Sequence, residues 1–421
     1  MSSDGKWPTM TLAEAGVVLL DCVHKTPPKA DAGYPYLSIP EMVNGHLDLE
    51  AARRISHQNF VEWTRKVAPQ AHDVVLSRRC NPGETAYVSP NAEFALGQNL
   101  VLLRADGRYV YPPFLRWLTR SSEWWEQVRT FLNVGAVFDS LKCADVPNFR
   151  VPIPPLSDQQ RITKVLDGLD DKIELNRKMN ATLEAMAQAI FKSWFVDFDP
   201  VRAKMEGREP AGMDAETAAL FPDRFEVVDG REVPVGWRIG TLGDAIEVFD
   251  SKRIPLSKRE REGRPGIYPY YGAASIVDYI DDFIFDGVYL LVGEDGSVIN
   301  NDKTPVIQYV WGKFWVNNHA HVLTGKGEVT VEQLFCCLRQ TNIQPFVTGA
   351  VQPKLNQSNL NKIPFVQAEP EINRLFGEMV DTLFALIRSN VEQSRTLAAL
   401  RDTLLPKLIS GEIRVPVNDI H

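Results

Sequence analysis

The sequence predicts an α+β protein: two similar mixed α/β units separated by a long antiparallel helical pair (a coiled coil), with a pseudo-twofold internal repeat. The repeat is the first observation behind this prediction, because Gly135–Val137 returns as Gly349–Val351 and Tyr34–Tyr36 returns as Tyr268–Tyr270. Second, a long heptad-patterned segment follows each copy. Third, 421 residues exceed one ordinary core and fit about two to four domains. Two copies are too few for a solenoid, so a pseudo-twofold molecule is expected.

In chain order, the sequence predicts five segments. They are a first globular unit at residues 1–152, a first helical region at 153–199, a linker at 200–229, a second globular unit at 230–366 and a second helical region at 367–421. Each globular unit contains short β-rich runs followed by a helix. These runs and helices are Asp73–Leu76, Leu100–Leu103 and Pro113–Thr119 in the first unit, and Gly287–Val292, Pro305–Val310 and Val331–Leu338 in the second.

Punctuating residues predict where the long helices begin and end. Ser157 and Gln160 have capping-box spacing directly after two prolines, and the next proline is Pro200, which allows a helix of roughly 58 Å. In the second helical region we expect Pro406 to end or kink the helix and Gly411 to cap it.

The heptad pattern predicts that the two long helices pair with each other. The pairing residues are expected at position a, namely Ile162, Leu169, Asn176, Leu183 and Ile190 in the first helix and Leu383, Asn390 and Leu397 in the second. Position d holds Val165, Lys172, Met179, Met186 and Ser193, and then Met379, Leu386, Gln393, Leu400 and Lys407. The same slot holds asparagine in both copies, which could fix the register through hydrogen bonds across the interface or could face solvent. A twofold axis would make the pairing antiparallel.

The charge pattern leaves nucleic-acid binding open despite a formal net charge of −8. The globular units are close to neutral, and their positive charge is clustered in both copies, which is compatible either with a solvated surface or with phosphate contacts. The stiff loop His24–Pro28 either presents Lys25 and Thr26 to DNA or only shapes a turn. The residues predicted to contact DNA are Lys25, Thr26, Arg53, Arg54, Arg78, Arg79, Lys252, Arg253, Lys258, Arg259, Arg261 and His319.

Several classes of chemistry have no sequence signal. The phosphate-binding loop G-x-x-x-x-G-K-[ST] is missing, so ATP hydrolysis is not expected. Tyr111–Phe114 imitates the tetrad of amino-methyltransferases but lacks its acceptor residue, and a turn entering a helix is the favoured interpretation. His319 and His321 would face the same side of a strand, yet the sequence shows no third ligand, so we predict core or DNA-contact histidines and no metal. No catalytic residue is predicted.

Cysteine usage and hydropathy indicate the compartment. The five cysteines include no C-x-x-C spacing, which predicts neither a disulfide framework nor a zinc finger, and Cys336 and Cys337 are expected in the core. No signal-peptide core and no membrane-length apolar run are recognisable. We therefore expect a cytoplasmic protein that makes no membrane contact.

Seven stretches of the sequence resemble the specificity subunits of type I restriction-modification enzymes. They are Ile153–Ile162, Phe191–Met205, Pro234–Trp237, Pro269–Ala273, Asn317–His321, Gln352–Asn356 and Leu404–Glu412. The resemblance implies two target-recognition domains that read an asymmetric bipartite duplex DNA site, with the helices setting the spacer. It implies as partners two modification subunits, which methylate adenine with S-adenosylmethionine, and two restriction subunits, which use ATP and Mg²⁺; this chain would bind no cofactor itself.

Two other functions remain open from the sequence alone. A self-sufficient DNA methyltransferase would transfer a labelled methyl group without partners. A coiled-coil adaptor would bind only protein, and its complexes would show no salt-dependent binding to duplex DNA.

Overall fold

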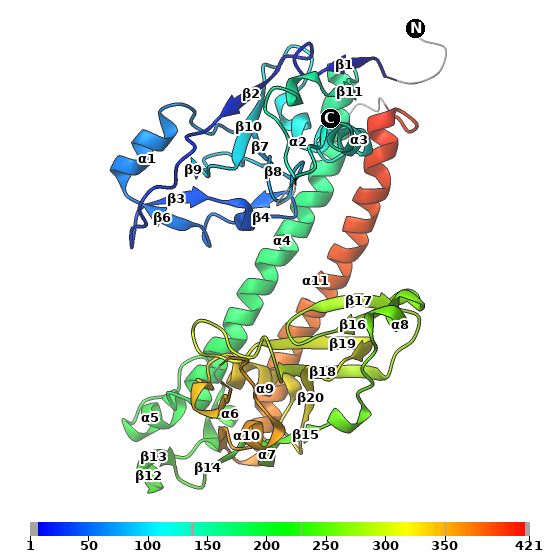
Figure 1. Ribbon diagram of the computed structural model, residues 1–421. Coiled ribbons are helices and arrows are strands. Elements are labelled where there is room, and N and C mark those ends of the chain that lie inside the picture. The colour runs from blue at the N-terminus through cyan, green and yellow to red at the C-terminus, as the bar shows by residue number, and fades with distance from the viewer. Residues whose placement is uncertain (1–6, 136–138, 229, 350, 417–421) are drawn as a thin grey trace. The chain divides into compact units, whose positions relative to one another are not determined.

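The computed structural model describes residues 7–135, 139–228, 230–349 and 351–416 (Figure 1). The chain forms two compact units: unit 1 is Met1–Asn176 with Glu392–His421, and unit 2 is Arg177–Val391. The boundary falls inside both long helices, α4 (Leu156–Phe195) and α11 (Pro370–Ser410). Each unit therefore contains one globular domain together with one end of each long helix.

Unit 1 is built on a four-stranded antiparallel sheet in the order β2-β10-β7-β8. Its strands are β2 (Val17–Asp21), β10 (Leu100–Ala105), β7 (Val74–Ser77) and β8 (Thr85–Tyr87). Side chains alternate between two cores, since Val74 and Leu76 belong to one apolar cluster whereas Val75 belongs to another. This alternation follows the two-residue period of a strand, and it explains why the central strands are apolar throughout.

A second, three-stranded sheet in unit 1 has the order β6-β3-β9. Its strands are β6 (Arg53–Ile55), β3 (Tyr34–Leu37) and β9 (Ala95–Leu96), and β3 pairs with β9 in parallel. The remaining elements of the globular domain are β1 (Thr9–Thr11), β4 (Met42–Val43), β5 (His46–Leu47), β11 (Arg150–Pro152), α1 (His57–Thr64), α2 (Leu115–Leu118) and α3 (Ser122–Phe131). The segment Pro112–Phe114 is a short 3-10 turn that enters α2, as predicted.

Unit 2 joins the equivalent strands into one sheet in the order β15-β20-β18-β19-β16-β17. The strands are β15 (Ile246–Val248), β20 (Ala320–Gly325), β18 (Phe285–Gly293), β19 (Ile307–Val316), β16 (Pro265–Tyr271) and β17 (Ile276–Ile280). The other elements are α5 (Asp199–Met205), α6 (Ala215–Leu220), β12 (Phe225–Val228), β13 (Arg231–Pro234), β14 (Arg238–Thr241), α7 (Leu242–Ala245), α8 (Lys258–Glu262), α9 (Val331–Leu338), α10 (Gln357–Asn361) and β21 (Pro364–Gln367).

The strand pairing confirms the internal repeat. The strand that carries Tyr34–Tyr36 and the strand that carries Tyr268–Tyr270 each make a parallel pair, with β9 and β19 respectively. The terminal strands of each domain also pair in both units, β1 with β11 and β14 with β21. The predicted fold class is therefore confirmed.

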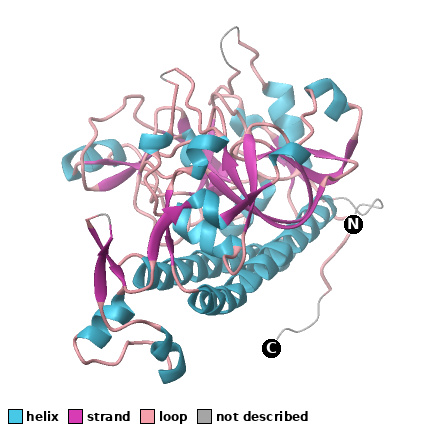
Figure 2. Ribbon diagram, turned by 90° about the horizontal axis from the view of Figure 1, so that it is seen from below, coloured by secondary structure: helices cyan, strands magenta, loops and turns pink. Residues whose placement is uncertain are grey.

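The paired ends of α4 and α11 run antiparallel, as predicted, and Figure 2 shows the two helices side by side. In unit 1, Asn176 Nδ2 donates to Gln393 Oε1 at 2.9 Å, and Asp170 accepts from Arg401 at 2.6 Å. The residue that comes first in α4 therefore contacts the residue that comes second in α11, which defines an antiparallel pair. In unit 2, Asn390 Nδ2 donates to Asn180 Oδ1 at 2.9 Å. Each predicted asparagine thus hydrogen-bonds to the facing helix.

The prediction that heptad position d forms the second row of buried residues is wrong, because the observed row is displaced by one residue along the chain. Six of the ten d positions are exposed, Met186 at 48% and Leu386 at 47% among them, none of the ten is fully buried, and the residues that follow them are covered instead. The observed row contains Leu166, Ala187, Trp194, Val380 and Leu408. The reason is that each helix end packs against its globular domain as well as against the other helix, which turns the buried arc away from the d positions. At position a, Ile162 and Asn176 are buried, and Leu169, Leu183, Ile190, Leu383, Asn390 and Leu397 are half-buried.

The start of α4 differs from its prediction, and α11 does not end at Pro406. Helix α4 begins at Leu156, one residue before Ser157. The Pro155 carbonyl accepts hydrogen bonds from the backbone amides of Asp158 and Gln159. Pro406 lies inside α11, which continues to Ser410 because Leu408 and Ile409 are buried in the unit 1 core and hold the last turn. The predicted cap is confirmed, since Gly411 follows the helix with a φ of +82°.

In each unit a buried ion pair fixes the globular domain to a long helix, with opposite polarity in the two copies. In unit 1, Arg116 of α2 pairs with Asp170 of α4, which also accepts from Arg401 of α11. In unit 2, Glu332 of α9 pairs with Arg388 of α11 at 3.5 Å. Burial raises the pKa of Asp170, but the His46 hydrogen bond and the Arg116 charge outweigh burial and hold this pKa well below its usual range.

We predict that Asp170→Asn destabilises unit 1 by about 1–3 kcal/mol at neutral pH, because it removes the buried carboxylate that Arg116 and Arg401 share and leaves each with one other acidic partner, Asp167 and Asp402. The depressed pKa means that the contribution of Asp170 is present above about pH 4 and is lost as the pH falls through its folded value. Urea unfolding monitored by tryptophan fluorescence measures the change. Asp171→Asn on the exposed neighbour is the control, and equal stability of the two variants would contradict the prediction.

Candidate nucleic-acid interface

At one edge of the unit 1 sheet, β2 and β7 end and β10 begins, which brings polar residues from distant parts of the chain together. The register pairs Asp21 of β2 with Val101, and Ser77 of β7 with Leu100, both on β10. Residues just beyond these strand ends must therefore meet. They are His24 after β2, Arg78 after β7, and Gln98 and Asn99 before β10.

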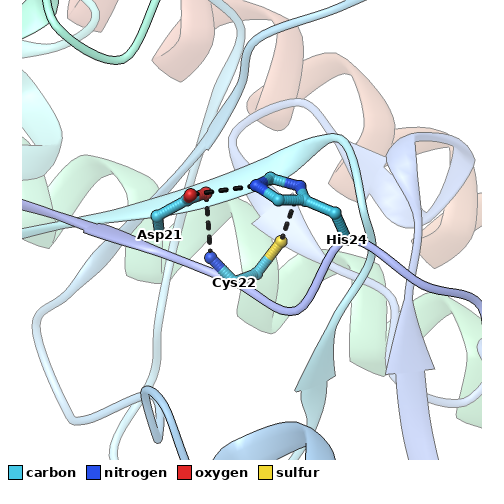
Figure 3. Close-up of side chains that lie close together, drawn as sticks. All are labelled: Asp21, Cys22 and His24. Carbon is cyan, nitrogen blue, oxygen red and sulfur yellow. Dashed lines mark hydrogen bonds and ion pairs between the residues drawn. The ribbon is translucent and has the colours of Figure 1, made fainter.

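Asp21, Cys22 and His24 form a compact cluster at this edge (Figure 3). His24 Nε2 lies 2.9 Å from Asp21 Oδ2, and His24 Nδ1 lies 4.0 Å from Cys22 Sγ. Burial raises the pKa of the Cys22 thiol to about 11, and the Asp21 carboxylate adds to this effect. Lys66 Nζ lies 3.4 Å from Asp21 Oδ2 and supplies the positive charge there. The contacts with Asp21 and with the Gln98 carbonyl, 3.0 Å from Nδ1, hold the His24 imidazole at this edge.

Two adjoining cavities at this edge collect several of the predicted DNA contacts. The first, of about 600 Å³, is lined by Thr26 and Arg53 among others. The second, of about 510 Å³, is lined by His24, Arg78 and Arg79. Three residues line both cavities, and none of them was predicted: Cys80, Gln98 and Asn99. Their position depends on strand register, for which a single sequence has no direct signal.

The loop after β7 is held in a fixed conformation. Cys80 at its tip has a φ of +63°, which is uncommon for a residue other than glycine. Ser77 Oγ donates to the Arg79 carbonyl at 2.9 Å, and the Gly83 amide donates to the Ser77 carbonyl at 2.9 Å. These bonds close the loop and fix where the two arginines leave the backbone.

At the corresponding edge of unit 2, the same positions carry different chemistry. His321 Nδ1 lies 2.6 Å from Asp250 Oδ2, and Arg253 Nη1 lies 2.6 Å from Glu294 Oε2. Burial lowers the pKa of His321, but the Asp250 carboxylate outweighs burial and raises it. Asp250, Glu294 and His321 lie close enough to share a metal ion, yet the Arg253 guanidinium already lies against both carboxylates. His319 pairs instead with Asp295, so the two histidines do not share one site.

The other predicted DNA contacts divide by exposure. Arg53 donates to the Pro27 carbonyl at 2.9 Å, and Arg261 lies 3.1 Å from Asp278 Oδ2, so both side chains have structural partners. Arg54 is half-buried beside Ala30 in the sheet. The exposed members of the set are Lys25, Thr26, Lys252, Lys258, Arg259 and His319, the last of which pairs with Asp295.

Two repeated α/β domains, each joined to one end of an antiparallel helix pair, define a two-domain recognition protein with a helical connector. A family model described as "Type I restriction modification DNA specificity domain" matches residues 21–185 and again 234–396, which together make up more than half of the chain. The chain belongs to this family and is a specificity subunit, the non-catalytic targeting component of a type I restriction-modification system.

Similar proteins carry the same description. The type I restriction enzyme HindI specificity subunit of Haemophilus influenzae is 27% identical, with 85% of this chain and 90% of that protein covered. The MjaIX specificity subunit of Methanocaldococcus jannaschii is 25% identical, with 92% and 86% covered. The crystal structure of the S subunit from M. genitalium matches with a TM-score of 0.55 at 16% identity, covering 97% of both chains, which shows the shared fold.

Membrane insertion has no structural support among the described residues, where every helix is too short or too polar to span a bilayer.

We predict that Arg253→Ala destabilises unit 2 by about 1–3 kcal/mol, because Glu294 and the Ala320 carbonyl lose their donor. Arg259→Ala on the exposed surface of α8 should stay within about 0.5 kcal/mol of the parent. Urea unfolding of the two variants measures the difference. If Arg253→Ala were as stable as Arg259→Ala, the ion pair would not hold this edge together.

Proposed function

We propose that this subunit recognises an asymmetric bipartite site in duplex DNA, with one globular domain on each half-site. One observation carries the proposal: topologically equivalent edges of the two domains present different side chains. Unit 1 places Arg78 and Arg79 directly after its strand, and unit 2 places Glu294 and Asp295 there. Because base edges in the major groove are distinguished by donor and acceptor pattern, different side chains at one position favour different half-sites.

The exposed basic residues would hold the DNA backbone without reading its sequence. Lys25 lies beside the unit 1 edge, and Lys252, Lys258 and Arg259 lie on the segment that follows β15 in unit 2. Exposed lysine and arginine side chains contribute phosphate contacts that weaken as the salt concentration rises. Contacts of this kind would orient each domain while the residues at the strand ends read bases.

The partner assignments of the family extend this proposal. Two modification subunits would dock on the long helices, flip the target adenine and methylate it with S-adenosylmethionine, and two restriction subunits would use ATP and Mg²⁺. Exposed apolar side chains on the helices support docking, since flexible methionine side chains suit a protein interface. These residues are Met179, Met186, Met379, Leu386 and Leu400.

Mapping methylated adenines in the source genome tests the function directly. The expected motif has two defined parts separated by unread base pairs, and the two parts differ in sequence. A single continuous motif, or methylation by this chain without partner subunits, would refute the proposal.

We predict that target DNA protects Cys80 from alkylation. Cys80 is the exposed thiol among the five cysteines and lines both cavities of unit 1. In a complex with modification subunits, saturating target duplex should slow its reaction with iodoacetamide at least several-fold, as measured by mass spectrometry. A Cys143→Ser background removes the half-buried thiol as a competitor. Equal rates with and without duplex would show that DNA does not cover this edge.

We predict that shortening both helices shortens the preferred spacer. Residues Asp171–Arg177 of α4 and Gln393–Ala399 of α11 face each other and lie between the buried ion pairs, so removing both preserves the heptad register. Seven residues at 1.5 Å each correspond to roughly 10 Å, or about 3 base pairs. Methylated-site mapping measures the change. Deleting only the α4 segment is the control, which should abolish activity by breaking the pairing; an unchanged spacer in the double deletion would refute the ruler.

A further inference from the structure

The corresponding sheet edges of unit 1 and unit 2 each place a charged residue directly after a strand, and the two charged residues have different partners. Ser77 pairs with Leu100 in unit 1 as Gly293 pairs with Ala320 in unit 2, so Arg78 occupies the position of Glu294. His24 follows Asp21 by three residues, as Arg253 follows Asp250. In unit 2 the resulting pair is an ion pair, Arg253 with Glu294 at 2.6 Å. In unit 1 the corresponding pair is Arg78 with a histidine.

Arg78 therefore lies without a carboxylate partner among the described residues. Within the described part of the chain it forms no ion pair, and its Nε is buried without a hydrogen-bond partner. Its Nη2 lies 3.2 Å from His24 Nδ1 and 3.5 Å from the Gln98 carbonyl. His24 is itself anchored between two acceptors, because its Nε2 lies 2.9 Å from Asp21 Oδ2 and its Nδ1 lies 3.0 Å from the Gln98 carbonyl oxygen. The guanidinium thus lies against the anchored His24 imidazole and the Gln98 carbonyl, which place it at this edge of the domain.

Two amide side chains lie beside this guanidinium. Gln98 and Asn99 line the same cavity, and neither side chain has an intramolecular hydrogen bond among the residues that the structure describes. The edge therefore combines one oriented fork of donors with two amides that each offer both a donor and an acceptor.

We propose that Arg78 is a specificity-determining residue that reads guanine in the half-site contacted by unit 1. The inference rests on the proposed function and goes beyond it by naming the base and the residue. A planar guanidinium matches the two acceptors of guanine, O6 and N7, in the major groove, and free amides suit an adjacent adenine. A base contact is favoured over a phosphate contact because Arg78 is half-buried and held in orientation, whereas the exposed Lys25 nearby suits the backbone.

The experiment uses the full subunit co-expressed with its modification subunits and maps methylated adenines for the parent, Arg78→Gln and Arg78→Lys. We expect both variants to relax the requirement for one G·C pair in one half-site, on the order of tenfold or more, and to leave the other half-site unchanged. Arg78→Lys keeps the charge but not the fork, so it separates base reading from charge alone. Arg108→Gln is the matched control, since Arg108 is exposed, pairs with Asp106 and lines neither cavity.

The outcomes separate the inference from the function. An unchanged motif in Arg78→Gln, whether methylation is normal or uniformly weaker at all sites, would overturn the inference, because a phosphate contact carries no base preference. A motif that loses discrimination at several positions in Arg78→Lys would also overturn it. A parent complex that methylates a continuous motif would instead overturn the proposed bipartite function.

Discussion

Burial of the apolar side of two long helices is the constraint on which the rest of this structure depends. Neither α4 nor α11 can cover that side alone, and each end of each helix is covered by the other helix and by a globular domain. In unit 1, Ile162 and Leu166 share a cluster with Leu405 and Leu408, residues from the far end of the chain. The Trp7 indole donates to the Leu408 carbonyl at 3.3 Å in the same region. The boundary between the two compact units therefore falls inside the helices, and each helix end belongs to the same unit as the domain that covers it.

Polar contacts make this apolar arrangement specific. Apolar burial alone tolerates sliding and exchange of similar surfaces, and the internal repeat supplies two similar domains. The opposite polarity of the Arg116–Asp170 and Glu332–Arg388 pairs penalises an exchange, because a domain on the wrong helix end would bring like charges together. The hydrogen bonds of Asn176 and Asn390 fix the register of the helix pair in the same way.

Local patterns predicted much of the fold, and non-local pairing explains what they missed. The strands around Val74 and Leu100, and helix α9, follow from local apolar runs. The covered residues at heptad position a follow from the heptad pattern. The second row of buried residues depends on the domain that packs beside each helix, which no periodicity encodes. Arg78 and Arg79, singled out as a basic cluster, lie at the unit 1 edge, and their contact with DNA stays a prediction. Gln98 and Asn99 were missed because only the register of β7 with β10 places them there. Likewise, the carboxylates that engage Arg253 lie on other strands.

The division of the chain has a consequence for its biosynthesis. Unit 2 is continuous from Arg177 to Val391, so it can complete its core once that stretch has left the ribosome. Unit 1 cannot, because Leu405, Leu408 and Ile409 complete its core and follow all of unit 2 in the chain. The first globular domain must therefore wait with an uncovered apolar surface until the residues after unit 2 have been translated, and termination before them would leave it open to chaperones and proteases.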